Sequence, residues 1–289
     1  MYPLIWFVIS VLSTVPAAAN SIDLVGSDFM WPWIEDALGP LDAANDSIDI
    51  AYSMKGSFPG LTDIRLDDAN LGIIAIAPGE SVPERPLVSI PIGYHVAYIL
   101  VHKSNQLREI SSNRLAGIFG ANEETDYGQW GQLGLLEWEA RTINPAIHSG
   151  ENSLADSIFR YTVLRTPELK GGVAEHLNAE ELESFISKNE NVIAVSSRSP
   201  NPNGQVRALP VALDIDSPGY VPTPETVHFR DYQMVLPYYL VFPESERSVV
   251  EPIVRYLLSD RFASRLEQEG FMPLPQRERQ RLGITLGRQ

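Results

Sequence analysis

The strongest constraint on the fold is a repeated pattern near the start of the chain, in which apolar segments alternate with turns and a helix. Segments 21–26, 47–54 and 71–78 have the apolar character of buried strands. Between the first two lies 33–38, whose apolar residues recur at helical spacing before Gly39 and Pro40 end the pattern. Strand–helix–strand units of this kind predict a parallel or mixed sheet with helices on its faces.

The remaining chain extends this pattern. We expect two strands within 88–105, separated at Gly93, and a long apolar strand pair over 232–242. We also expect a helix from about Ser153 to Leu164 and a closing helix over 248–271. The sequence Asn-Ala-Glu-Glu that begins at Asn178 resembles a capping box and marks the start of another helix.

Length and charge limit the architecture and the partners. With 289 residues, the chain is too long for one small core and suits two lobes. Its formal net charge of −15 repels nucleic acid and anionic membrane surfaces. We therefore expect no nucleic-acid partner, and any anion-binding site would have to work through local hydrogen-bond donors.

Side chains typical of catalysis or metal binding are sparse. The chain has no cysteine, which excludes disulfides, thiolate zinc sites and cysteine nucleophiles. Its five histidines are scattered without metal-ligand spacing, and the sequence contains neither a nucleophile elbow nor a phosphate-cradling lysine loop. We expect a protein that acts by binding, with no catalytic residue, metal or cofactor.

The first 19 residues indicate export. An uncharged apolar run, 4–12, precedes Ala17, Ala18 and Ala19, which fit a small-residue cleavage site. No Lys or Arg precedes this run, so an uncleaved anchor is the alternative; the run is shorter than the ~20 residues of a bilayer span. We expect cleavage after Ala19, a periplasmic or secreted mature protein, and no membrane span within it.

Several segments resemble the phosphate-binding proteins of phosphate ABC transporters. Similar motifs are the Gly-Ser turn in VGSDFMWPWIEDAL, the middle segment VAYILVHKSNQLREISSNRLAGIFGANEETDYGQW, and Ser149-Gly150 before a helix. The C-terminal order of YQMVLPYYLVF, RYLLSDRFASRLEQ and EGFMPLP also looks like that family. The resemblance covers most of the chain after residue 21.

This resemblance implies a type II periplasmic-binding-protein-like fold, with two α/β lobes, mixed sheets flanked by helices, and hinge crossover strands. We expect lobe 1 to hold residues 20–93 and 232–289, and lobe 2 to hold residues 94–231. The family places its ligand between the lobes, on helix N-termini and loop amides that favour an oxyanion. A small anionic or polar solute and an ABC permease are the implied partners, and we expect a monomer.

The candidate ligand-binding residues lie in three turns that follow predicted strands. Each turn supplies amides or hydroxyls, although each residue alone is also explained as a cap or turn former. Their joint placement after successive strands favours binding. The candidates are Gly26, Ser27, Asp28, Ser57, Ser149, Gly150, Asn152 and Ser153.

Three positions depart from the family pattern. The family's arginine before Ser-Gly-Thr is missing from INPAIHSG, and Arg141 lies too far upstream to replace it. Glu151 stands where the family has threonine; it is either a favourable first-turn residue or a competitor of the anion, and its carboxylate opposes an anion in both cases. Ala75 and Ala77 stand near the end of the third strand, where the family has an acid that accepts the ligand's proton.

Two main hypotheses follow, from different functional classes. The first is an exported solute-binding protein that captures a small oxyanion, phosphate by default, for ABC uptake. The second is a degenerate phosphate-binding-like domain that serves as a sensory or protein-interaction module without phosphate binding. An enzyme on the same scaffold is a third hypothesis. We interpret His148 as a surface residue, and Trp31, Trp33 and Trp130 as packing residues.

Overall fold

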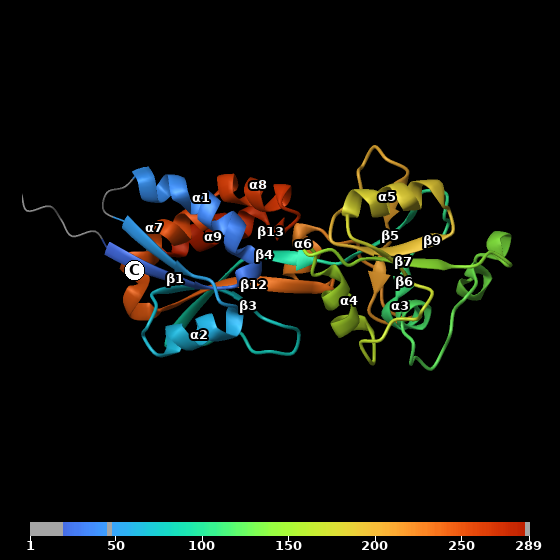
Figure 1. Cartoon of the computed structure of the whole chain (residues 1–289), viewed down its shortest axis with the longest axis horizontal. Coiled ribbons are helices and arrows are strands. Elements are labelled where there is room, and N and C mark those ends of the chain that lie inside the picture. The colour runs from blue at the N-terminus through green and yellow to red at the C-terminus, as the bar shows by residue number, and fades with distance from the viewer. Residues whose placement is uncertain (1–19, 45–47, 287–289) are drawn as a thin grey trace, which may run out of the picture.

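The computed structural model describes residues 20–44 and 48–286, which form two lobes side by side along the long axis of the molecule (Figure 1). The predicted leader, residues 1–19, and its cleavage site after Ala19 lie outside the described residues. Within the described part of the chain, no helix is both long and apolar enough to cross a membrane.

Lobe 1 is built on a six-stranded mixed sheet with the order β13-β4-β12-β3-β1-β2. β1 runs parallel to β2 and β3, whereas β12 runs antiparallel to β3 and β4. The segments that the sequence marks as apolar form this sheet because helices bury them on both faces. The strands are β1 (Asn20–Gly26), β2 (Ile48–Ser53), β3 (Leu71–Ala75), β4 (Leu87–Val96), β12 (Val235–Pro243) and β13 (Met272–Pro273).

Helices cover both faces of this sheet. In Figure 1, α1, α7, α8 and α9 lie on one face and α2 lies on the other. Leu24, Ile73 and Leu240 are fully buried in the core beneath the first group, and Ile64 of α2 is fully buried in a separate cluster. The helices are α1 (Trp31–Ala44), α2 (Ser57–Arg65), α7 (Arg247–Leu257), α8 (Asp260–Gln268) and α9 (Gln276–Leu286), with 3₁₀ turns η1 (Asp28–Met30) and η4 (Glu244–Glu246).

Lobe 2 contains a five-stranded sheet with the order β10-β5-β9-β7-β8, and a separate two-stranded pair, β11-β6. Its strands are β5 (Tyr98–His102), β6 (Ile110–Ser111), β7 (Asn144–His148), β8 (Ala174–His176), β9 (Val192–Ser196), β10 (Val206–Ala208) and β11 (Val211–Ala212). Its helices are α3 (Ser112–Phe119), α4 (Ala155–Val163), α5 (Ala179–Lys188) and α6 (Pro224–His228), with 3₁₀ turns η2 (Trp130–Leu133) and η3 (Leu136–Trp138).

The two lobes are joined through β4 and β12, which lie side by side in the sheet of lobe 1. β4 ends at Val96 and β5 of the second sheet begins at Tyr98, and the chain returns to the first sheet at Val235. The predicted α/β fold with two lobes and mixed sheets is therefore confirmed. The predicted lobe boundaries at residues 93 and 232 lie a few residues from these crossings and stay a prediction.

Gly93 does not separate two strands, as the sequence had suggested, because β4 continues through it. A side chain at Gly93 would place its Cβ 3.0 Å from Leu266 Cδ1 and 3.2 Å from the carbonyl oxygen of Met272. The glycine therefore allows β4 to approach α8 and β13 closely, and it marks tight packing instead of a turn.

Other predicted boundaries also need correction. The closing helix is two helices, because Ser259 caps α8 by accepting a hydrogen bond from the amide of Phe262 at 3.2 Å. The strand pair expected over 232–242 is the single strand β12. The helix expected from about Ser153 begins at Ala155.

The predicted cap at Asn178 is confirmed, since its side chain accepts hydrogen bonds from the amides of Glu180 and Glu181.

The contact between α2 and β1 generates the first prediction. A Cβ at Gly60 would lie 2.6 Å from Gly26 Cα, so Gly60→Ala should lower the free energy of unfolding by about 1–3 kcal/mol through overpacking. Chemical denaturation followed by circular dichroism measures this change. As a matched control, Gly283→Ala in α9 meets open space and should raise stability by up to about 1 kcal/mol. Equal effects of the two variants would contradict the close approach of α2.

Candidate functional site

The first predicted turn is fixed to the turn before α2 and to β3. Gly26 has φ of +126°, and its carbonyl accepts a hydrogen bond from the amide of Gly56 at 2.8 Å. The amide of Ser27 donates to the carbonyl of Ile73 at 2.8 Å, and Ser27 is buried. Asp28 is exposed, and its carboxylate accepts from the amide of Phe29 at 3.0 Å. These groups are therefore engaged within lobe 1.

The hydroxyl of Ser57, at the start of α2, also has a partner inside the protein. It accepts a hydrogen bond from the amide of Ala75 at 2.9 Å and so ties α2 to the end of β3. Two residues further on, the amide of Ala77 donates to the carboxylate of Glu80 at 3.0 Å. An acidic residue, Glu80, therefore does follow the third strand, but its carboxylate accepts a hydrogen bond within its own loop.

The third predicted turn, between β7 and α4, shows the same pattern. The amide of Ser149 donates to the carbonyl of His176 at 2.9 Å, and its hydroxyl lies 3.3 Å from the Glu175 carboxylate. A Cβ at Gly150 would lie 2.1 Å from the carbonyl oxygen of Leu177. This turn therefore packs against the end of β8, and glycine is required there by sterics.

Ser153 serves as a local cap within the same turn. Its hydroxyl accepts from the amide of Ala155 at 3.2 Å and lies within 3.4 Å of the carbonyl of His148. Asn152 and Glu151 are exposed. The prediction that Glu151 lies in the first helical turn is wrong, because α4 begins four residues later, at Ala155.

His95, which the sequence did not single out, connects the two lobes at this point. Its Nε2 lies 3.3 Å from the amide nitrogen of Leu154, the residue that precedes α4, and accepts its hydrogen bond. Since Nε2 is the acceptor, the neutral ring must carry its proton on Nδ1. Nδ1 is buried and has no hydrogen-bond partner within the described residues. An imidazole therefore stands at the helix N-terminus where an anionic ligand would be held.

Aromatic rings surround His95 on the side of lobe 1. Its ring centroid lies 5.4 Å from that of Phe29 and 5.3 Å from that of Phe271, in edge-to-face contacts. Trp33 and Tyr238 pack against Phe271 at 5.1 and 5.6 Å. The prediction that Trp33 packs in the protein is consistent with these contacts. The space next to the first turn is thus filled by an apolar cluster that disfavours a hydrated anion.

The electrostatics of the two histidines follow from this burial. Burial, and then the nearby His148, lower the pKa of His95 to about 3, so its imidazole is neutral near pH 7. Burial also lowers the pKa of His148, whose Nδ1 lies 2.8 Å from the Ser197 hydroxyl. The interpretation of His148 as a surface residue is wrong, because only 5% of it is exposed.

Arg198, which the sequence analysis did not single out, supplies a cation near this site. It follows β9, the neighbour of β7, and its charge contributes to the lowered pKa of His148. Its guanidinium lies 3.7 Å from the carboxylate of Glu180. With Phe271 and other residues of both lobes, it lines a hollow of about 490 Å³ between the lobes.

The structure thus brings the predicted residues together in two groups. Gly26, Ser27, Asp28 and Ser57 form one group at the edge of lobe 1, and Ser149, Gly150, Asn152 and Ser153 form the other at the start of α4. His95 joins them, because its ring contacts Phe29 beside the first group and the amide of Leu154 beside the second. Its only signal in the sequence is a lone histidine within an apolar strand.

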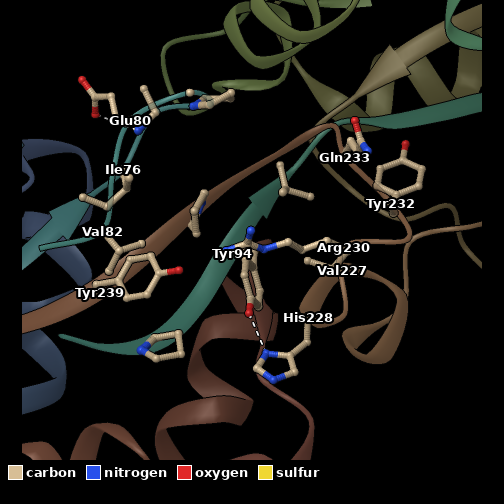
Figure 2. A pocket seen from close by; sticks show the side chains of 16 residues that line it. Ile76, Glu80, Val82, Tyr94, Val227, His228, Arg230, Tyr232, Gln233 and Tyr239 are labelled. Atoms are coloured by element: carbon tan, nitrogen blue, oxygen red, sulfur yellow. Dashed lines mark hydrogen bonds between the residues drawn. The ribbon is translucent and has the colours of Figure 1, made fainter. Parts of the chain in front are cut away.

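A separate hollow of about 380 Å³ lies at the hinge (Figure 2). It is bounded by the loop after β3, by β4 and β12, and by the segment 227–233 that returns from lobe 2. None of the predicted site residues lines it. Tyr94 and Tyr239 point into it, and the side chain of Arg230 extends over Tyr94 (Figure 2).

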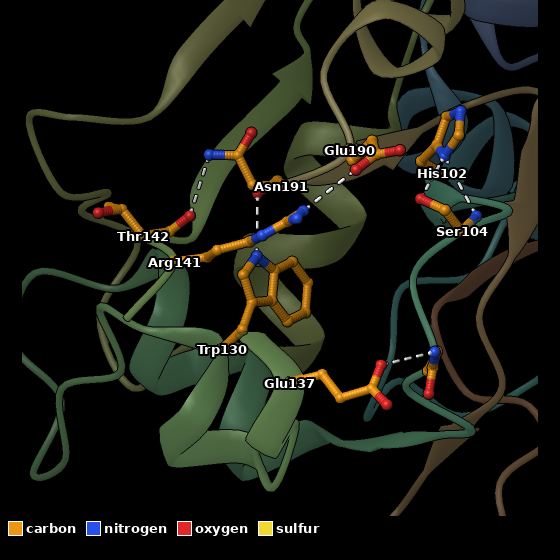
Figure 3. Close-up of polar contacts among 9 residues, drawn as sticks. His102, Ser104, Trp130, Glu137, Arg141, Thr142, Glu190 and Asn191 are labelled. Carbon is orange, nitrogen blue, oxygen red and sulfur yellow. Dashed lines mark hydrogen bonds and ion pairs between the residues drawn. The ribbon is translucent and has the colours of Figure 1, made fainter. Parts of the chain in front are cut away.

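Arg141 has a different role, far from these hollows (Figure 3). Its guanidinium lies 3.1 Å from the Glu190 carboxylate and 4.3 Å from the ring centre of Trp138. Beside it, the indole of Trp130 is fully buried and donates to the carbonyl of Asn191 at 3.2 Å. The expectations that Arg141 cannot replace the missing arginine and that Trp130 is a packing residue are both consistent with this arrangement.

Within the described residues, no cluster of three or more histidine, aspartate or glutamate side chains could hold a metal ion. The geometry just described consists of hydrogen bonds, ring contacts and the ion pairs of Arg198 with Glu180 and of Arg141 with Glu190.

Comparison with known proteins identifies the family of this chain. A domain family described as the PBP superfamily domain matches residues 13–261. No significant match is found among curated protein sequences. The solved structures that resemble the chain include an ABC-type phosphate transport receptor from Vibrio cholerae, with 14% identity over 88% of this chain and 100% of that chain, and a TM-score of 0.63.

Two further structures show the same fold. PstS from Borrelia burgdorferi is 15% identical over 89% of this chain and 99% of that chain, with a TM-score of 0.67. A possible phosphate binding protein from Planctomyces limnophilus is 12% identical over 93% of this chain and 98% of that chain, with a TM-score of 0.68. Because the family match spans most of its length, this chain belongs to the PBP superfamily and has the type II periplasmic-binding-protein-like fold.

Proposed function

We propose that this chain is a PBP-type sensory or protein-interaction module whose interlobe phosphate site has been closed by its own side chains. The observation that carries the proposal is the hydrogen bond from the Leu154 amide to His95 Nε2 at 3.3 Å. In a phosphate site, that N-terminal amide would be free to donate to the anion. Here a neutral imidazole from the other lobe accepts the hydrogen bond that the anion would accept.

The charges around the site support the same conclusion. The carboxylates of Asp28 and Glu175 lie beside the two predicted turns, and a phosphate there would meet like charge. The nearby cation, Arg198, already faces Glu180. With a net charge of −15, the protein adds no long-range attraction for an anion. The amides of Ser27, Ser149 and Ser153, like that of Leu154, already donate to acceptors within the protein.

A second candidate function is capture of a small polar solute or oxyanion for ABC uptake, with phosphate as the family default. One buried atom favours it: His95 Nδ1 has no hydrogen-bond partner within the described residues. A buried donor without an acceptor is costly, and a bound solute would satisfy it. The Vibrio cholerae protein is an ABC-type phosphate transport receptor, and phosphate transport is proposed for this chain only as this second candidate.

Both candidates place the protein outside the cytoplasm, through cleavage of the leader after Ala19. Expression of the full chain in a Gram-negative host should therefore yield a mature protein in the periplasmic fraction that begins at Asn20. N-terminal sequencing of that fraction measures the cleavage site. A protein that retains residues 1–19 and sediments with membranes would support the uncleaved anchor instead.

Titration of phosphate separates the two candidates. For residues 20–289, stripped of bound solute by unfolding and refolding, calorimetry should show no saturable heat with phosphate up to millimolar concentrations, because His95 and the turn carbonyls already use the donors. Circular dichroism must first show that the refolded protein is native. Saturation at one phosphate per chain in the micromolar range would overturn the proposal, and Arg198→Gln would then test whether Arg198 supplies the missing cation.

The buried histidine also predicts an effect of pH. Unfolded His95 takes up a proton below its ordinary pKa of 6.5, whereas the native residue stays neutral down to about pH 3. Stability contributed by neutral His95 is thus present above pH 6.5 and is lost as the pH falls below it, by up to about 1.4 kcal/mol per pH unit.

Urea unfolding between pH 6.5 and about pH 5 measures this dependence. His95→Gln keeps an acceptor for the Leu154 amide but cannot titrate, so its stability should vary less with pH than that of the wild type. His102→Gln is the matched control, because that ring is partly exposed and hydrogen-bonds Ser104 in its own turn. It should keep the wild-type pH dependence. The same slope in His95→Gln and wild type would refute the role of His95.

A further inference from the structure

The hollow at the hinge has the construction of a ligand pocket. Its volume of about 380 Å³ falls in the range of small-molecule sites. Apolar side chains from both lobes form most of its wall, and a few polar groups converge on it. The apolar residues are Ile76, Val82, Val227, Val235, Pro91 and Pro237.

Two tyrosines supply neutral hydroxyls to this hinge pocket. Burial raises the pKa of both Tyr94 and Tyr239, so both phenols stay protonated at physiological pH. The Tyr94 hydroxyl lies 2.9 Å from His228 Nδ1, and the opposite nitrogen of that ring lies 3.9 Å from the Glu278 carboxylate (Figure 2). The pocket floor is thus held in place by a chain of contacts that reaches α9.

Arg230 is the cation of the pocket. Its side chain extends over Tyr94 (Figure 2), and its charge partly offsets the effect of burial on the pKa of Tyr94 and Tyr239. None of the ion pairs found among the described residues uses Arg230, although the chain has 37 acidic and only 22 basic residues. The guanidinium therefore has no carboxylate at ion-pair distance within the described part of the chain.

The backbone at Arg230 adds an independent observation. Its φ is +66°, in the left-handed region that residues with a side chain rarely adopt. Arg230 follows Phe229, the C-cap of α6 (Pro224–His228), where helices commonly end with a residue in this conformation. From this helix end, the side chain of Arg230 extends over Tyr94 (Figure 2).

We propose that the hinge pocket binds a small amphipathic anion, with a ring-sized apolar body and a single carboxylate or sulfonate. The apolar walls would cover the body, and Arg230 would bind the charged group with the help of the Tyr239 hydroxyl. Glu80 also lines the pocket, and its carboxylate disfavours a multiply charged ligand such as phosphate. This site shares no lining residue with the predicted interlobe site and does not depend on whether that site binds phosphate.

The probe for this site is 8-anilinonaphthalene-1-sulfonate, whose fluorescence rises on transfer to an apolar pocket. We expect saturable binding to residues 20–289 at one site per chain, with benzoate competing and uncharged benzamide competing at least roughly tenfold more weakly. Arg230→Gly should weaken probe binding by roughly tenfold or more. Glycine accepts a φ of +66° without strain, so this variant should fold as well as the wild type.

Arg198→Gln is the matched control, because it removes an arginine from the interlobe hollow and should leave probe binding unchanged. Unchanged probe binding in Arg230→Gly, with native circular dichroism, would overturn the proposal. Equal competition by benzoate and benzamide would also overturn it, because the pocket would then bind apolar ligands without distinguishing a charged ligand from an uncharged one. Each result is independent of the phosphate titration, so failure of one proposal leaves the other standing.

Discussion

The pairing of β4 with β12 is the constraint on which the rest of this structure depends. The two strands pair from Leu87 opposite Pro243 to Val96 opposite Val235, and they carry the chain between the lobes. Neighbouring residues of a strand face opposite sides of the sheet. His95 therefore points to the aromatic cluster of lobe 1 and the amide of Leu154, whereas Tyr94 points into the hinge pocket. The strand pair thus positions both the His95 contact and the hinge pocket.

This shared support has a mechanical consequence. Lobe opening would pull Leu154 away from His95 and would also change the hinge pocket, whose walls come from both lobes. A ligand that binds the pocket better in one arrangement shifts the protein toward that arrangement. Under the two proposals, a ligand of the hinge pocket would therefore also shift the His95 contact. The proposed sensory role needs such a link between a ligand and a change of shape.

The sequence predicted the fold well because the fold depends on local patterns. Apolar strands and the cap at Asn178 each follow from nearby residues. The predicted helix end at Gly39 and Pro40 is wrong, because α1 continues through both residues to Ala44. The site was harder, since its decisive contact joins residues 59 positions apart, His95 and Leu154. Gly93 was misread for the same reason, because what it accommodates is α8, far along the chain. Local patterns specify where turns occur, but they do not specify which residues from distant parts of the chain pack against those turns.

The departures from the family become coherent once His95 is included. Loss of the arginine before Ser149 removes the strongest attraction for an anion, and the free amides of α4 would then be left without a partner. A neutral histidine acceptor satisfies the amide of Leu154 without bringing a charge into an apolar cluster. A protonated histidine could not accept that bond. The low pKa of His95 is therefore the condition under which its ring accepts the hydrogen bond of the Leu154 amide near pH 7.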